Sequence, residues 1–355
     1  MPPFVERRAH GGLLDDELAR LGIHPDEVLD VSVNVNPYGP CPAVVAAVRA
    51  ARVDRYPDPT AQPAREAIAR ATDTDPRSIV VGNGAVDLLW TIVRALLPAG
   101  RVALVVEPAF SEFAAAVKAA GSRVVSWRAL AEADFCVDLD RVGDVAAREK
   151  AEIVYVCTPA NPTGVALEAA SLAAFAAAHP ALLFVVDESF GPLSERFDDQ
   201  QHVMPDNVVR VRSMTKEHAL PGVRVGYLVA RRPIAACVEA ARPPWTTSAF
   251  AQAAAIAALG ERAFVIESRM RALDDRRRLV ARLRDIGYSP FRSSTLFFLV
   301  PVRDGASTRA RLLARHRVLV RDCASFGLPG FVRICAQPPS REARLLEALR
   351  DEGQP

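Results

Sequence analysis

The sequence lacks the features that mark several large classes of protein. Its 355 residues carry a formal net charge of only +2, and the arginines are spread along the whole chain. No basic stripe for nucleic acid or for an anionic membrane is therefore expected. The apolar runs are far too short to cross a bilayer. The start, MPPFVERRAHGG, has no apolar core of the kind found in signal peptides. We expect a cytoplasmic protein whose partners are neither nucleic acid nor membrane.

Cysteine and lysine are both scarce. The six cysteines are scattered without a CxxC pair, which argues against a metal site or a disulfide framework. Only three of the 44 lysine and arginine residues are lysines. Lys118 lies in an alanine-rich helical stretch and Lys150 in a polar loop, and solvent exposure explains both. Lys216 needs a separate explanation.

Lys216 follows a predicted strand, in the segment RSMTKEHALPGVRVGY. A lysine that forms a Schiff base must be held partly neutral by an apolar wall and a neighbouring cation. Taken alone, Lys216 is more readily interpreted as a surface lysine after a strand. Its neighbours in the sequence decide between the two interpretations.

Short runs of valine, isoleucine and leucine alternate with alanine-rich helical stretches. Runs that are apolar on both faces predict a mostly parallel sheet of seven strands, covered by helices on both sides. We place this large domain at residues 45–240. A long amphipathic helix over about 249–286, followed by alternating strands and a last helix from Ser340, predicts a small α+β domain. This small domain takes in residues 1–44 and 241–355. The strands of the large sheet are expected near 79–81, 102–106, 124–125, 153–157, 182–186, 208–211 and 225–229.

Three groups around these strands suit a phosphate. Gly82-Asn83-Gly84 follows the first strand and opens a helix, where backbone amides can close around an anion. Ser213 and Arg224 flank Lys216 and can supply a hydroxyl and a guanidinium to the same phosphate. The glycine turn alone is a weak signal, because many turns between a strand and a helix look alike.

Three residues at other strand ends suit a pyridine ring. Asp187 ends the strand at 182–186 and can keep a ring nitrogen protonated, although it is also a plausible helix N-cap. Asn161, in TPANPTG, can donate to a ring oxygen, although the motif also passes as a plain turn. Phe110 can stack on the ring, although a lone phenylalanine is more often part of a core. The order of all these elements along one sheet carries more weight than any one of them.

With these motifs the chain resembles, over nearly its full length, the fold-type I pyridoxal 5'-phosphate (PLP) enzymes of the class I and II aminotransferase group. The resemblance implies the aspartate aminotransferase-like α/β fold and a homodimer. It implies Lys216 as the Schiff-base lysine and Asp187 on the ring nitrogen. Asn161 would bind the ring oxygen and Phe110 would cover the ring. The phosphate would be held by Gly84, Ala85, Ser213 and Arg224, and Tyr56 would reach the partner's cofactor.

Within this group the chain is similar to threonine-phosphate decarboxylases and to histidinol-phosphate aminotransferases. In the decarboxylase branch, His10, Arg321 and Arg333 would face the phosphate and the carboxylate of the substrate. We expect decarboxylation of L-threonine-O-3-phosphate, a step of cobalamin side-chain synthesis. The alternative is a histidinol-phosphate-type aminotransferase that uses 2-oxoglutarate or glutamate, and the motif at Asn36, a candidate substrate ligand, is typical of that branch. Five positions near the site depart from the decarboxylase pattern: Ala85, Glu217, His218, Thr295 and Gln337.

Two further classes fit less well. Transcription regulators that use this fold as a sensor carry a basic winged-helix module ahead of it, and here the cofactor domain starts too early for one. A non-catalytic scaffold does not need Lys216, Asp187 and Asn161 together.

Overall fold

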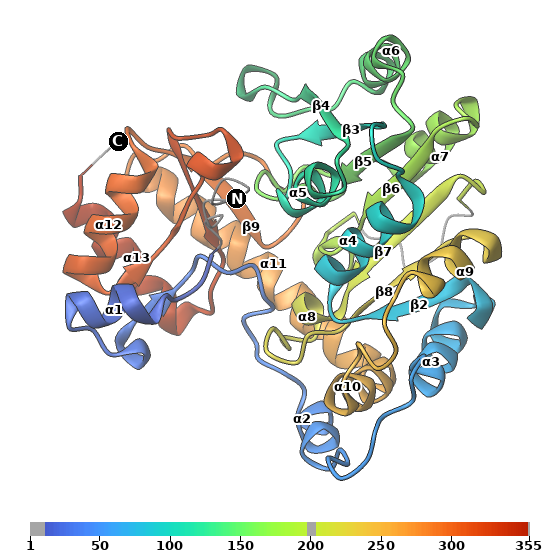
Figure 1. The fold of residues 1–355 in the computed structure, drawn as a ribbon. Helices are drawn as coiled ribbons and strands as arrows, with labels where there is room; N and C mark the ends of the chain where they lie inside the picture. The colour runs from blue at the N-terminus through green and yellow to red at the C-terminus, as the bar shows by residue number, and fades with distance from the viewer. Residues whose placement is uncertain (1–10, 197–203, 354–355) are drawn as a thin grey trace.

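The computed structural model describes residues 11–196 and 204–353. A seven-stranded sheet forms the centre of the larger part of the molecule (Figure 1). Its strand order is β2-β8-β7-β6-β5-β3-β4, and only β8 runs antiparallel to its neighbours. The predicted, mostly parallel sheet is thus confirmed. The strands are β2 (Ile79–Gly82), β3 (Val102–Glu107), β4 (Arg123–Arg128), β5 (Ile153–Cys157), β6 (Leu183–Asp187), β7 (Val208–Ser213) and β8 (Gly226–Val229).

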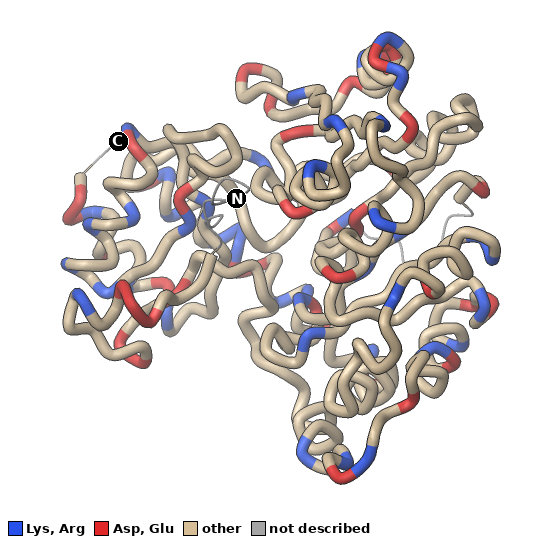
Figure 2. The backbone as a smooth tube through the Cα atoms, in the orientation of Figure 1, with Lys and Arg blue, Asp and Glu red and all other residues tan. Residues whose placement is uncertain are grey.

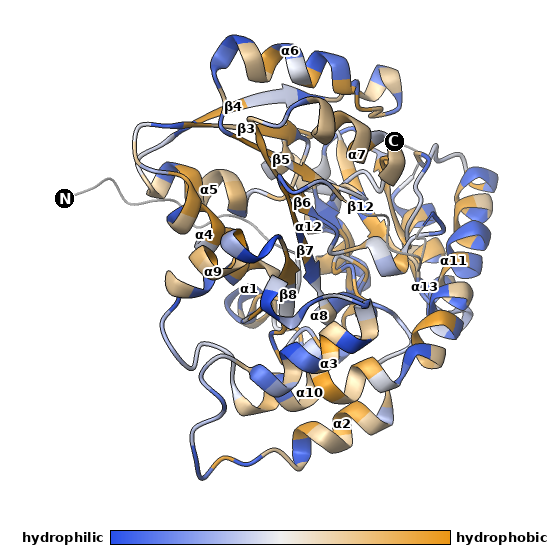
Figure 3. Ribbon diagram, turned by 90° about the vertical axis from the view of Figure 1, so that its right-hand side faces the viewer, coloured by the Kyte–Doolittle hydropathy of each residue, from blue (hydrophilic) through white to orange (hydrophobic). Residues whose placement is uncertain are grey.

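Helices cover both faces of this sheet, which explains why its inner strands are apolar throughout. In β3, Ala103 and Val105 pack under one layer of helices, and Leu104 and Val106 pack under the other. Figure 3 shows the inner strands as hydrophobic and most of the flanking helices as two-sided. The first layer contains α4 (Ala85–Leu96), α5 (Glu112–Ala119) and α9 (Arg232–Ala240). The second contains α2 (Pro42–Arg49), α3 (Gln62–Thr72), α6 (Leu139–Glu149), α7 (Ala169–Ala178) and α10 (Ala249–Gly260).

The C-terminal part has its own core around a three-stranded antiparallel sheet of order β11-β12-β9. The N-terminal segment joins this part, because β1 pairs in parallel with β10 (Figure 1). The predicted domain limits at 44/45 and 240/241 stay a prediction. The strands are β1 (Leu29–Asp30), β9 (Phe297–Pro301), β10 (Val318–Leu319), β11 (Arg321–Asp322) and β12 (Phe331–Cys335). The helices are α1 (Asp15–Leu21), α11 (Arg262–Asp285), α12 (Gly305–His316) and α13 (Pro339–Asp351).

The single helix predicted over 249–286 is wrong. The chain forms two helices there, α10 and α11, which meet at an angle of 80°. The break falls at Gly260 and Glu261, where glycine weakens the helix and the glutamate leaves helical geometry. The two halves also have different surroundings, since α10 is alanine-rich and packs on α2 and α3, whereas α11 is rich in arginine.

Charges of both signs are spread over the described residues (Figure 2). Basic and acidic residues are interspersed along the backbone tube in Figure 2 rather than gathered by sign. Among the described residues, no single helix has both the length and the apolar composition for a membrane span. Only the strongly bent pair of α10 and α11 passes that test when taken together.

Candidate active site

The loops after the parallel strands converge on one cavity of about 450 Å³. Strands β3, β5, β6 and β7 all end at the same edge of the sheet, where α/β folds collect ligands. Most of the predicted site residues line this cavity, and the lining also includes residues from the C-terminal part of the chain. The predicted residues in the lining are Ala85, Phe110, Asn161, Asp187, Ser213, Lys216, Arg224, Arg321 and Arg333.

Lys216 lies in the single-turn helix α8 (Met214–Glu217), directly after β7. Burial and the charges of Arg224 and Arg333 lower the pKa of its amine from 10.5 to about 8. The neutral fraction of this amine near physiological pH is therefore far larger than that of an ordinary lysine, and an amine must be neutral to attack an aldehyde. The partly apolar wall and the neighbouring cations expected from the sequence are both present.

Asp187 is the carboxylate at the end of β6 that faces the cavity. Its Oδ2 accepts a hydrogen bond of 2.9 Å from the Tyr155 hydroxyl, and its Oδ1 accepts one of 2.9 Å from the Ser189 amide. Burial raises the pKa of Asp187, and the hydrogen bonds from Ser189 and Tyr155 oppose that rise. The next residue, Glu188, instead bonds Arg210 and Arg212. Of these two carboxylates, only Asp187 lines the cavity.

A compact turn follows β2 and begins α4. Gly84 has φ of +85°, and a Cβ built on it would lie 2.6 Å from a guanidinium nitrogen of Arg224. A Cβ on Gly226 would lie 2.9 Å from the Ala85 amide nitrogen, so the backbones approach closely here too. The Ser213 and Thr215 hydroxyls lie 2.7 Å apart in the same lining.

This turn has the donor chemistry of a phosphate site. It combines the N-terminal amides of a twelve-residue helix with a guanidinium and two hydroxyls. Only glycine leaves the space that the cradle needs at position 84. The residues therefore fit PLP: the turn would hold its phosphate, Lys216 would supply the amine for its aldehyde, and Asp187 would supply a carboxylate for its ring nitrogen.

Two buried arginines form the opposite wall. Arg321 on β11 and Arg333 on β12 are paired positions of neighbouring strands. Arg333 donates to Asn161 Oδ1 and to the Ser32 carbonyl oxygen, and burial lowers its pKa to about 10. Arg321 donates to Ser325 Oγ at 2.7 Å, and burial lowers its pKa as well. Two adjacent guanidinium groups of this kind suit a ligand with phosphate or carboxylate oxygens.

Some predicted site residues do not line the cavity. Tyr56 is 80% exposed and packs against Trp245 with the two rings tilted by 34° and 5.0 Å between their centroids. The Asn36 amide donates to the Glu217 carbonyl oxygen and to Ser268 Oγ, so it supports the segment around Lys216. His10 lies outside the described residues. Gly84 flanks the cavity through its contact with Arg224.

Sequence reasoning missed Asn34. Its side chain is buried in the cavity lining, and neither its nitrogen nor its oxygen has a hydrogen-bond partner among the described residues. An unpaired amide is costly unless a ligand pairs with it. The alternation Ser32-Val-Asn34-Val-Asn36 carried a usable signal, because it brings asparagine to two positions two residues apart. The sequence alone did not reveal which of these two asparagines lines the cavity.

Four of the five departures from the decarboxylase pattern lie outside the cavity lining. Thr295 donates to the Leu193 carbonyl oxygen, and Gln337 is buried. The carboxylate of Glu217 and the imidazole of His218 lie 3.3 Å apart. Ala85 alone lines the cavity.

Comparisons with known proteins agree on one family. The family described as "Aminotransferase class I and II" matches residues 26–350. A histidinol-phosphate aminotransferase of Symbiobacterium thermophilum is 32% identical, over 99% of this chain and 96% of the relative. The crystal structure of a histidinol-phosphate aminotransferase from Sinorhizobium meliloti, in complex with pyridoxal-5'-phosphate, superposes with a TM-score of 0.85 and 28% identity. That match covers 96% of each chain.

These comparisons overturn the expected decarboxylation of threonine phosphate. Several curated relatives with about 30% identity over nearly the whole chain are histidinol-phosphate aminotransferases. The L-threonine-O-3-phosphate decarboxylase from Porphyromonas gingivalis has 24% identity and a TM-score of 0.76, over 91% of this chain and 98% of that one, a likeness that shows the fold alone. The expectation was wrong because Arg321 and Arg333 suit any ligand with two anionic groups, whichever bond at its Cα is broken.

Proposed function

Since the chain belongs to the class I and II aminotransferase family and is a PLP-dependent enzyme, we propose that it transfers the amino group of a small phosphorylated amine of the histidinol-phosphate type to 2-oxoglutarate. One observation carries this proposal. Lys216, whose pKa is lowered to about 8, lines the same cavity as the residues of the phosphate cradle and the paired Arg321 and Arg333. The cavity is thus suited to two separate anions, that of the cofactor and that of the substrate.

The paired arginines serve both halves of the reaction in this proposal. Their guanidinium groups bind the phosphate of the amino donor in the first half and a carboxylate of 2-oxoglutarate in the second. Asn34 offers one donor and one acceptor next to them, which suits an anion oxygen and a substrate N–H or O–H group. The names of the curated relatives favour histidinol phosphate as the donor.

Lys216 acts as the acid and base of the reaction. When bound, PLP supplies an electron sink for the negative charge that develops at the substrate Cα. Neutral Lys216 Nζ removes the proton from Cα on one face, and the resulting ammonium returns a proton within the same site. The carboxylate of Asp187 would stabilise a positive charge on the ring nitrogen of the bound cofactor. Phe110 and the other lining side chains limit the access of water.

We also propose that the enzyme works as a homodimer. Tyr56 is 80% exposed and Trp245 is 47% exposed, although both are large aromatic side chains. Phe250 and Ile256 add exposed apolar surface from α10. A second copy would cover these residues and bring Tyr56 to the partner's cavity, as the family resemblance implies. Sedimentation at micromolar concentration tests this, and a monomer with full activity would contradict it.

The test of the reaction is a coupled assay. Purified protein with PLP is incubated with histidinol phosphate and 2-oxoglutarate, and glutamate is measured, with Lys216→Ala as the control. Glutamate that depends on both compounds and on Lys216 supports the proposal. Glutamate formed from another amino donor, with none from histidinol phosphate, overturns the proposal that the donor is of the histidinol-phosphate type. CO2 release without glutamate overturns the transamination itself.

A further inference from the structure

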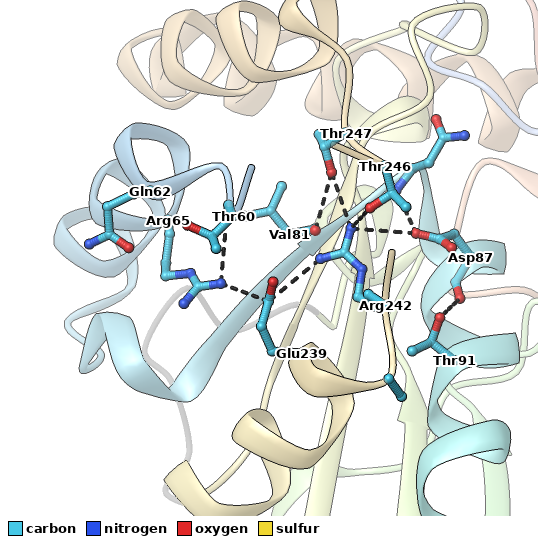
Figure 4. Close-up of polar contacts among 12 residues, drawn as sticks. Thr60, Gln62, Arg65, Val81, Asp87, Thr91, Glu239, Arg242, Thr246 and Thr247 are labelled. Carbon is cyan, nitrogen blue, oxygen red and sulfur yellow. Dashed lines mark hydrogen bonds and ion pairs between the residues drawn. The ribbon is translucent and has the colours of Figure 1, made fainter. Parts of the chain in front are cut away.

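Arg242 is a buried arginine outside the cavity, in the loop between α9 and α10. Its side chain is only 4% exposed. The guanidinium lies among four oxygen-bearing side chains from three segments (Figure 4). One of its nitrogens donates to Thr246 Oγ1 and, at 3.3 Å, to Thr247 Oγ1. The carboxylates of Glu239 and Asp87 lie 3.6 and 3.8 Å from its nitrogens.

The contact with Asp87 leads to the glycine turn. Asp87 lies in the first turn of α4, and its Oδ2 accepts a hydrogen bond of 2.9 Å from the Asn83 amide. A Cβ on Gly82 would lie 3.1 Å from the same oxygen, so the carboxylate packs directly against the turn. The charge of Arg242 therefore helps to hold the carboxylate that shapes residues 82–84.

The contact with Thr247 leads to the strand before the same turn. Thr247 Oγ1 donates to the Val81 carbonyl oxygen at 3.3 Å, near the end of β2. Gln252 donates to the carbonyl oxygens of both Thr247 and Asp58, at 3.0 and 2.9 Å. The loop that carries Arg242 is thus fastened both to the turn and to the segment that follows Tyr56.

Glu239 closes the network on its far side. Its carboxylate accepts a hydrogen bond of 2.7 Å from Arg65, which also donates to the Thr60 carbonyl oxygen. Two arginines and two carboxylates therefore share one partly buried cluster (Figure 4). Removal of Arg242 leaves Asp87 without its cation, so the carboxylate is free to turn toward solvent and release the Asn83 amide.

We propose that Arg242 is a positioning residue for the cofactor phosphate. It acts through Asp87 on the Asn83 amide and through Thr247 on Val81, and so keeps the glycine turn in the shape that receives a phosphate. This rests on the proposed role of residues 82–84 as the phosphate site. Arg242 itself contacts neither cofactor nor substrate.

The experiment compares two ligands that differ only in the phosphate. Apoprotein is titrated with PLP and with pyridoxal, and binding is followed by absorbance. We expect Arg242→Met to weaken PLP binding roughly tenfold, the size of a lost hydrogen bond to a charged group, with little change for pyridoxal. Asp87→Ala should have the same effect, and the double variant should be no weaker than the weaker single variant. Arg242→Lys should recover part of the loss.

A control variant breaks an ion pair of similar kind elsewhere. Arg309→Gln removes the pair between Arg309 and Glu17, in the C-terminal part of the fold, and should leave PLP binding unchanged. Unaltered PLP binding in Arg242→Met, or an equal loss for pyridoxal, would overturn the positioning role. If Arg242→Met does not fold, Asp87→Asn and Arg242→Lys give the same comparison. Wild-type protein without a preference for PLP over pyridoxal would instead overturn the phosphate role of the turn.

Discussion

The two walls of the cavity come from different parts of the chain and are built differently. The proposed cofactor wall consists of Asp187, Ser213, Lys216 and Arg224 in the cavity lining, at or near strand ends, and of Gly84 in the turn that flanks the cavity. The arginine wall, made of Arg321 and Arg333, lies on two antiparallel strands of the small sheet.

The two walls also differ in what their groups contact. In the cofactor wall, close backbone approaches and a positive φ fix the shape. In the arginine wall, Arg333 donates hydrogen bonds to neutral oxygens of Asn161 and Ser32. The first wall is shaped by backbone geometry, whereas the second consists of two buried guanidinium groups on paired strands. A family with one cofactor and varied substrates has reason to separate the two.

The largest effect is expected from Lys216→Ala. This variant removes the amine that captures the cofactor and moves the proton at the substrate Cα. We expect kcat to fall on the order of 10³- to 10⁴-fold, as for the loss of a general acid and base. Sodium borohydride should no longer fix PLP to the protein, which mass spectrometry detects. A borohydride-reduced adduct of PLP with Lys216→Ala would show that another amine forms the Schiff base.

Gly84→Ala should damage the cofactor wall alone. The new Cβ would meet Arg224 and would force a non-glycine residue into positive φ. Strain of about 1–3 kcal/mol predicts PLP binding weaker by roughly 5- to 150-fold. With PLP at saturation, KM for the amino donor should change little. A large change in KM with normal PLP affinity would mean that the two walls are not separate.

Arg321→Met should damage the arginine wall alone. The loss of a charge-assisted hydrogen bond predicts a rise in KM for the phosphorylated donor of about 10- to 100-fold. The affinity for PLP should stay at the wild-type value in an equilibrium titration. A weaker effect on a donor that lacks the phosphate would identify the anion that Arg321 binds.

The smallest expected effect is a dependence on pH. It tests whether Arg333 in the arginine wall influences the pKa of Lys216 in the cofactor wall. Because the pKa of Lys216 is lowered to about 8, its neutral fraction rises with pH across this value. The rate at which apoprotein captures PLP should therefore increase about tenfold from pH 7 to pH 9. Arg333→Gln removes a nearby positive charge, which raises the pKa of Lys216 and moves the rise to higher pH. Stopped-flow absorbance measures this shift, and an unchanged profile would contradict the coupling.

Periodicity was enough to predict the sheet from the sequence, whereas PLP and the proposed cofactor wall were predicted from residue types at strand ends together with the family resemblance. Apolar runs on both faces can only be buried between two layers of helices, and the residues after parallel strands must meet at one edge. The scarcity of lysine directed attention to Lys216. These signals are local, because each motif lies within a few residues of the strand that positions it.

Only the tertiary structure decided the features that depend on distant segments. Three features are of this kind: the bend between α10 and α11, the presence of Asn34 rather than Asn36 in the cavity lining, and the contact of Arg242 with Asp87. Each depends on contacts between segments, and the order of the residues in the chain does not reveal these contacts. The choice of reaction failed for a related reason, since two arginines in a sequence indicate an anion and not the bond that breaks. Local patterns determine elements and chemistry, whereas packing between elements determines which side chains face one another.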